Sequence, residues 1–146
     1  MGIFKVFGAS SDTRVALNAA EAFASICLVA IASDGYLSET EAIEMKTRLS
    51  RMKLFEDSLN ELDRMRDYLV DNLKKYGPNE LIKSAQVSLP PQLGSTAFAI
   101  AVDLVFSDGT VSSEERAFID DLRRILAIPD NLALKIVEVM TIKNQG

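Results

Sequence analysis

Apolar residues recur along most of this chain at three- and four-residue spacing, which is typical of one face of an α-helix. Residues 12–33 are apolar on nearly every face of such a helix, so they are predicted to form a central helix. Residues 92–107 repeat this character in the second half. No stretch of any length alternates with period two, so strands are not expected. The hydrophobic pattern therefore predicts an all-α fold.

Amphipathic segments follow each of the two apolar ones. Three of them open at Ser38, Ser58 and Ser112 with a Glu three residues later, the pattern of a capping box at a helix start. The helix over residues 58–76 is expected to end at Gly77, because Pro78 disfavours helix in the residue before it. A short helical piece over residues 79–87 and a last helix from Pro129 bring the number to about seven.

These helices should form one domain over residues 1–146. The positions expected to face its core from the amphipathic segments are Ala42, Met45, Leu49, Met52, Leu59, Leu62, Met65, Leu69, Leu73, Phe118, Ile119, Leu122, Ile125, Leu126, Leu132, Ile136, Val137 and Met140.

One eight-residue stretch occurs twice, 74 positions apart. Residues 34–41 and 108–115 both read Asp-Gly-x-(Leu/Val)-Ser-x-x-Glu, and each copy follows one of the two apolar segments. Two segments that break in the same way predict two helix-turn-helix units related by approximate internal twofold symmetry. The first repeat would span about residues 12–76 and the second about residues 92–143.

Helix capping explains much of the repeated stretch. In the first copy Gly35 tolerates the positive φ that ends a helix, and Ser38 with Glu41 caps the next one. Capping does not explain Asp34 or its counterpart Asp108, since an acid at a helix C-terminus faces the negative end of the helix dipole. A purely structural interpretation therefore leaves these two acids unexplained.

Cation binding is the second interpretation of the stretch. Each copy reproduces the second half of an EF-hand calcium loop, but apolar residues stand where the first acids of that loop would be. Two copies brought together could pool Asp34, Glu41, Asp108 and Glu115 in one site. Oxygen ligands suit Ca, Mg or Mn, and such a cation would relieve the repulsion among four carboxylates.

Composition narrows the classes of function. The chain has 16 basic and 21 acidic residues, a net charge of −5, and its basic residues do not cluster, so nucleic acid is not an expected partner. There is no His, and no pairing of a nucleophile with a base can be proposed, so an enzyme is not expected.

Localisation and three single features complete the sequence evidence. The lone Cys27 lies in an apolar run and is predicted to be a buried hydrophobic residue. Without a disulfide framework, a cleavable signal or about 20 consecutive apolar residues, the protein is expected to be cytoplasmic and not transmembrane.

Phe4 and Phe7 are expected to dock on the core, the alternative being contact with a membrane. Asp103, an acid within an apolar run, is expected to face solvent rather than to act near the repeated stretch.

The repeated stretches resemble those of the tellurite-resistance TerB-like proteins. The resemblance rests on Ala-Ile-Ala-Ser-Asp-Gly at residues 30–35, on Ser38-x-x-Glu41, and on Leu-Phe-Glu-Asp at residues 54–57. Ser-Asp-Gly at residues 107–109, Glu-Glu at 114–115 and Leu-Ala-Ile-Pro-Asp at 126–130 resemble the second repeat of that family. The likeness covers about residues 16–129, whereas the N-terminus and residues 76–91 match no family pattern.

The resemblance implies an all-helical, cytoplasmic, pseudo-twofold fold with an acidic cluster proposed to chelate metal at Asp34, Glu41, Asp108 and Glu115. It also implies a role in tellurite resistance or a related stress response, within a multi-protein assembly at the inner membrane face. We therefore predict a non-enzymatic, metal-binding interaction module with protein partners. The alternative is a helical protein-protein adaptor in which the repeated motif only caps helices and binds no metal.

Overall fold

The computed structural model describes residues 15–33 and 35–146, and in them the chain is helical throughout, with no strand. The prediction of an all-α fold is confirmed. The elements are α1 (Ala19–Ala32), α2 (Glu39–Ser50), the 3-10 helix η1 (Lys53–Glu61), α3 (Leu62–Ser88), the 3-10 helix η2 (Pro91–Leu93), α4 (Gly94–Phe106), α5 (Ser113–Ile125) and α6 (Asp130–Lys143). No helix in this part of the chain has the length and apolar composition needed to cross a bilayer.

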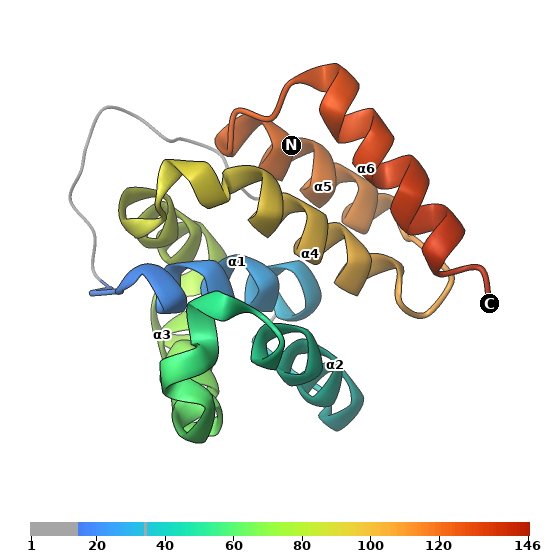
Figure 1. Ribbon diagram of the computed structural model, residues 1–146. Helices are drawn as coiled ribbons and strands as arrows, with labels where there is room; N and C mark the ends of the chain where they lie inside the picture. Colours follow the sequence, from blue (N-terminus) through green and yellow to red (C-terminus); the bar gives the residue numbers. More distant parts are fainter. Residues whose placement is uncertain (1–14, 34) are drawn as a thin grey trace.

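The bundle is arranged around α1 and α4. These two helices lie side by side and run in the same direction, with α2 and α3 on the side of α1 and with α5 and α6 on the side of α4 (Figure 1). Both central helices therefore end at the same end of the molecule. The turns that follow them, which hold the two repeated stretches, are consequently neighbours.

The central helices are buried on nearly all faces, as their composition predicted. In α1 every residue from Ala22 to Val29 is buried, including Cys27, whose predicted role as a buried hydrophobic residue is confirmed. The Phe23 ring packs edge-on against that of Phe55 with 6.1 Å between ring centroids, a favourable geometry for aromatic pairs. This contact attaches η1 to the core.

The predicted capping box at Ser58 is wrong. Residues 53–61 form the 3-10 helix η1, Ser58 has non-helical backbone angles (φ −123°, ψ 20°), and α3 begins at Leu62 without a side-chain cap. A 3-10 helix has three residues per turn, so its faces differ from those of an α-helix. Phe55 is fully buried as a result, and Leu59, which was expected to face the core, is 46% exposed.

The connection between the halves breaks at Gly77, where the end of a helix was predicted. The predicted helices over residues 58–76 and 79–87 are parts of one element, α3, which carries a break at Gly77. Gly77 has a φ of +87°, a conformation that glycine adopts without strain, and Pro78 follows it. Six α-helices are thus labelled in the described residues, and one of them, α3, consists of two helical segments that meet at this break. In α6, Ala133 is buried and Leu132, predicted to face inward, is partly exposed.

Asp103 does not face solvent, so that prediction is also wrong. The residue is only 5% exposed. Its carboxylate accepts hydrogen bonds from Arg48 Nε at 2.8 Å, from Lys143 Nζ at 3.1 Å and from Asn144 Nδ2 at 2.9 Å. Arg48 also pairs with Glu44, whose Oε2 lies 3.3 Å from the guanidinium. One buried carboxylate on α4 thus connects α2 with the C-terminal end of α6.

The partners of Asp103 keep it ionised. Burial by itself would raise the pKa of this carboxyl group, but the hydrogen bonds from Arg48, Asn144 and Lys143 and the Arg48 charge outweigh burial, so the pKa lies below its ordinary value. Burial by itself would lower the pKa of Arg48, but the hydrogen bonds and charges of Asp103 and Glu44 outweigh burial, so this pKa lies above its ordinary value. Breaking such a pair leaves a charge with little water around it.

Asp103→Asn should reduce the free energy of unfolding at pH 7 by about 3 kcal/mol, because it removes the main counter-ion of Arg48. Since the folded pKa of Asp103 is depressed, its contribution is complete above the unfolded pKa of about 3.9 and is lost as the pH falls through the folded value. Urea unfolding from pH 7 down to pH 2 should therefore show the two proteins converging below about pH 4. A constant difference would contradict this, and Asp57→Asn, on an exposed acid, serves as the control.

Cys27 should be unreactive in the folded protein. Burial raises the pKa of its thiol to about 12, against the opposing influence of the Arg48 charge, so almost no thiolate is present near neutral pH. Ellman's reagent at pH 8 should react only as fast as the protein unfolds, and guanidinium chloride should restore a full equivalent. Rapid stoichiometric labelling of the native protein would contradict the burial of this residue.

Candidate functional site between the two turns

Both central helices stop at a glycine, as predicted. Gly35 and Gly109 have φ angles of +87° and +82°, which residues other than glycine rarely adopt. The amide of Gly35 donates to the carbonyl of Ala32 at 2.8 Å, and that of Gly109 donates to the carbonyl of Phe106 at 3.0 Å. The two copies therefore turn the chain in the same way.

Both predicted capping boxes of the repeated stretch are confirmed. Ser38 Oγ accepts the Glu41 amide at 3.1 Å, and Glu41 Oε1 accepts the Ser38 amide at 3.0 Å. Ser112 and Glu115 make the same two bonds at 3.1 and 2.8 Å. Each glutamate thus uses one carboxylate oxygen to hold the start of a helix, and its other oxygen is not part of the cap.

A third capping box opens α1 and was missed in the sequence. Asn18 Oδ1 accepts the Glu21 amide at 2.8 Å, and Glu21 Oε1 accepts the Asn18 amide at 2.9 Å. The signal was present as Asn-x-x-Glu directly before the apolar run, because Asn is as good an N-cap as Ser. The helix begins here at Ala19, within the range predicted for it.

Asp108 has a local structural role that is separate from helix capping. Its Oδ1 accepts the amide of Thr110 at 3.0 Å and lies 3.4 Å from the Thr110 hydroxyl. This is an Asx turn, in which an Asp or Asn side chain bonds the backbone two residues on. Asp34, its counterpart, lies outside the described residues.

The two turns line one common groove of about 470 Å³. The first turn and α2 contribute Tyr36, Ser38, Thr40, Glu41 and Glu44; the second turn and α5 contribute Ser107, Asp108 and Glu115; and Ile31, Leu104 and Val105 complete the lining from α1 and α4. The structure thus brings three of the four predicted acids, Glu41, Asp108 and Glu115, to the same groove.

Glu44 is an acid of this groove that the sequence reasoning missed. It lies three residues after Glu41, a spacing that places two side chains on the same helix face and could have indicated it. Its carboxylate pairs with Arg48, which in turn pairs with the buried Asp103. The wall of the groove is therefore connected to the polar network inside the bundle.

The acids of the groove do not converge on one point. Within residues 15–33 and 35–146, no group of three or more Asp, Glu or Cys side chains lies close enough together to hold a metal ion. Glu41 and Glu115 are each directed back to a helix start, and Asp108 is directed to Thr110. Any cation in the groove would need water molecules to complete its ligands.

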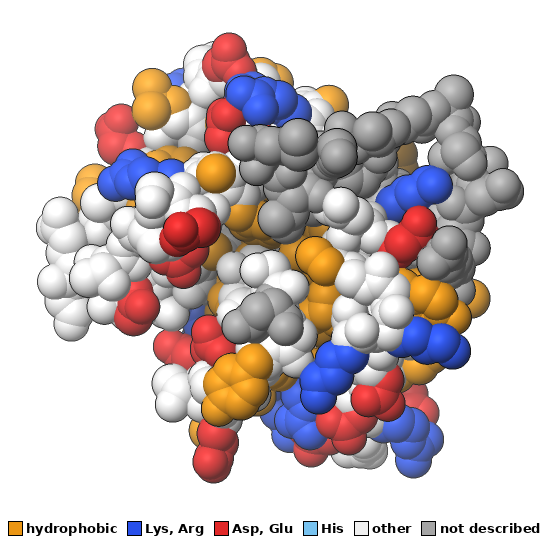
Figure 2. All heavy atoms as spheres, turned by 180° about the vertical axis from the view of Figure 1, so that it is seen from behind, with side chains coloured by type: hydrophobic (Ala, Val, Ile, Leu, Met, Phe, Trp, Pro, Cys, Tyr) orange, Lys and Arg blue, Asp and Glu red, His pale blue; other side chains and the backbone are white. Residues whose placement is uncertain are grey.

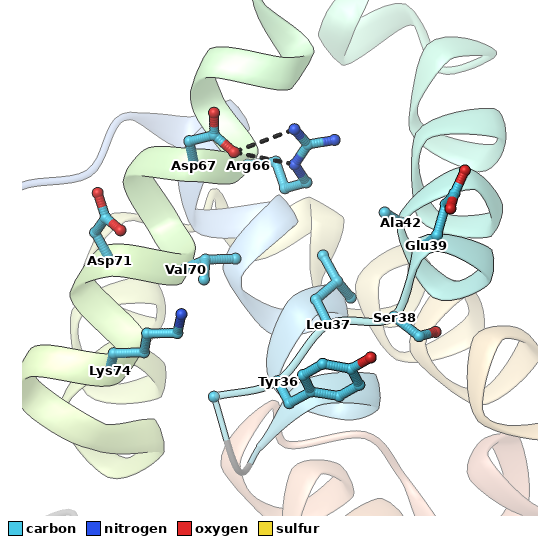
Figure 3. Close-up of a pocket in the computed structure, with 11 residues that line it drawn as sticks. Tyr36, Leu37, Ser38, Glu39, Ala42, Arg66, Asp67, Val70, Asp71 and Lys74 are labelled. Carbon is cyan, nitrogen blue, oxygen red and sulfur yellow. Dashed lines mark hydrogen bonds and ion pairs between the residues drawn. The ribbon is translucent and has the colours of Figure 1, made fainter.

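A second cavity, of about 710 Å³, adjoins the first turn (Figure 3). It lies between the segment that contains Tyr36 and Leu37 and the side chains of Val70 and Lys74 on α3. Tyr36, which is 70% exposed, and Ser38 line both this cavity and the acidic groove. Its charges are of both signs, so its lining favours neither anions nor cations.

Charges of both signs are also mixed on the surface. On the face shown in Figure 2, Lys and Arg side chains lie among Asp and Glu side chains, and apolar side chains are visible between them. Basic and acidic residues, which are mixed along the sequence, are therefore also mixed in space on this face. A nucleic-acid surface, in contrast, gathers basic residues in a patch or stripe.

Comparison with known proteins gives no relative: no protein-family model, no curated protein and no solved structure matches the chain. The resemblance to TerB-like proteins accordingly stays a prediction that rests on the two repeated stretches and on residues 54–57 and 126–130.

The capping boxes should contribute measurably to stability. Ser38→Ala and Ser112→Ala are each expected to lower the free energy of unfolding by about 1 kcal/mol, because each leaves a helix-start amide without its acceptor. The double variant should lose about the sum, since the caps belong to different helices. Urea unfolding measures both effects. Ser113→Ala, at the exposed residue beside the second cap, is the control, and an equal loss there would contradict a specific role of the caps.

Proposed function

We propose that this protein is a non-enzymatic, divalent-cation-responsive interaction module of the TerB-like kind. One observation carries the proposal: the two Asp-Gly turns face a common groove lined by Glu41, Asp108 and Glu115. Capping alone would be satisfied if the turns lay at opposite ends of the bundle. Their placement at one groove favours a joint function.

A pseudo-twofold repeat of helical hairpins belongs to the same proposal. Each half has a buried helix, a glycine with positive φ, a Ser-x-x-Glu cap and a second helix, in the same order and at a spacing of 74 residues. The parallel course of α1 and α4 in Figure 1 is the course that a twofold axis along these helices would produce. Repeat one would span about residues 12–76 and repeat two about residues 92–143.

The chemistry of the groove favours a hard cation. Carboxylates held on one groove repel one another, and a divalent cation would relieve that repulsion. The capping bonds of Glu41 and Glu115 each use one oxygen, and the other oxygen is available to Ca, Mg or Mn. With part of each ligand already engaged, we expect weak binding, roughly 10⁻⁴ to 10⁻³ M, as in the weakest protein calcium sites.

The structural adaptor remains the second candidate, and a specific observation favours it. The capping boxes and the Asx turn give Glu41, Glu115 and Asp108 structural roles that need no metal. In that case the bundle would only present surfaces to protein partners. Under either candidate, we propose a cytoplasmic setting in tellurite resistance or a related stress response, within a membrane-associated complex, as the TerB-like resemblance implies.

Thermal unfolding with Ca, Mg and Mn tests the proposal. A cation at 100 times its dissociation constant should add about 2.7 kcal/mol to the free energy of unfolding. Asp108→Asn should abolish the shift while keeping the turn, because Asn forms the same Asx turn without the charge. Asp34→Asn is expected to act in the same way.

Sodium chloride of equal ionic strength and the Asp57→Asn variant are the controls for general charge screening. If no divalent cation raises the melting temperature at concentrations up to about 100 mM, or if both Asp variants retain the full shift, the cation proposal fails and the adaptor stands.

A further inference from the structure

A groove follows the line between α5 and α6 in the second half of the bundle. It consists of two depressions, of about 190 and 380 Å³, which share Phe106 and Arg116 in their linings. The floor of the first depression is formed by Phe98 and Phe106 of α4, and its walls include Ile119 of α5 and Val137 of α6. Its lining is therefore mainly apolar.

The place equivalent to the second depression is open in the first half too, as the cavity of about 710 Å³ that Gly35, Leu37 and Ala42 line. The place equivalent to the first depression is closed. There the depression between α2 and α3 has a volume of only about 10 Å³. Ala42 and Leu49 of α2 line it, together with apolar side chains of α3. In the second half Arg116 stands 74 positions after Ala42. Arg123 stands 74 positions after Leu49. Two apolar residues are thus replaced by arginines where the groove is open.

The two arginines differ in their partners. Arg123 pairs with Asp120 and Asp130. The exposed Arg116 guanidinium has no hydrogen bond or ion pair with any described residue. A cation that has no partner among the described residues and lies beside an apolar floor fits a ligand that combines an apolar surface with a carboxylate. A nucleic acid or an anionic membrane would instead require several unpaired cations.

The length of the groove fits a helix. On the α6 side its lining extends from Ala133 to Thr141, about 12 Å or about two helical turns, and continues at Asn144 and Gln145 just past the end of the helix. Leu134, 66% exposed, lies three residues before Val137 and seven before Thr141, so it belongs to the same side of α6 and extends the apolar rim. Helices that dock in grooves present apolar residues at this spacing.

We propose that the α5–α6 groove binds an amphipathic helix of a protein partner, whose apolar face covers Phe98 and Phe106 and whose acidic side chain pairs with Arg116. This docking is independent of the cation proposed for the groove between the two turns. It assigns the partner surface to the second repeat, because only there is the apolar depression beside the central helix open.

The test uses the full-length protein and two fluorescein-labelled helical peptides of about 15 residues. Both peptides carry Leu at successive i, i+4 and i+7 positions, one with Glu and the other with Lys on the flanks. Fluorescence anisotropy should show saturable binding of the Glu peptide and about tenfold or more weaker binding of the Lys peptide. Arg116→Glu should reverse this preference.

Lys135→Glu is the matched control, since it makes the same charge change on an exposed residue of α6. Lys135 lies two residues from both Ala133 and Val137, so it points away from the groove. Circular dichroism should show Arg116→Glu to be folded, because Arg116 has no described partner to lose. If that variant does not fold, Arg116→Gln should still weaken binding of the Glu peptide.

Three results would overturn the proposal: no saturable binding of the Glu peptide, equal binding of both peptides, or an unchanged preference in the Arg116 variants. Light scattering of the protein alone tests whether a second copy of this chain occupies the groove instead. A concentration-dependent doubling of mass that Arg116→Glu abolishes and Lys135→Glu retains would assign the groove to a second copy of this chain and would reject a helical partner.

Discussion

The buried carboxylate of Asp103 is the constraint on which the arrangement of the helices depends. An ionised group excluded from water is tolerated only when its oxygens are bonded, so the donors from α2 and from the end of α6 have to stay beside α4. Close packing of apolar side chains already restricts how the helices cross, and these directional bonds add a further constraint. Through Arg48 and Glu44 the same network reaches the wall of the acidic groove.

The groove between the turns joins stability and function in the same residues. Glu41 and Glu115 begin helices, and both line a cavity that two separate turns create together. Their positions are therefore precise, because a cap holds the side chain in one geometry. A cation would add to this arrangement through the oxygens that capping leaves free, and an adaptor would use the same rigid turns without one.

The two halves share a plan and differ on their outer sides. Both use a glycine stop and a Ser-x-x-Glu cap, but the apolar depression that is open between α5 and α6 is nearly closed at the equivalent place, where Leu49 lines it. Repetition of the turn preserves the common groove. The exchange of Ala42 and Leu49 for arginines in the second half changes only one side of the bundle, which is where a partner surface can arise without disturbing the core.

The sequence by itself determined the helical fold, the glycine stops and the caps at Ser38 and Ser112, because these features depend on residues within about four positions of one another. The box at Ser58 was wrong because residues 53–61 form a 3-10 helix, in which Phe55 is buried against Phe23, a residue 32 positions earlier in the chain. Only the tertiary structure decided the environment of Asp103, whose partners lie 55, 40 and 41 positions away, and the meeting of two turns at one groove. Such contacts arise from the packing of helices, which local spacing does not encode.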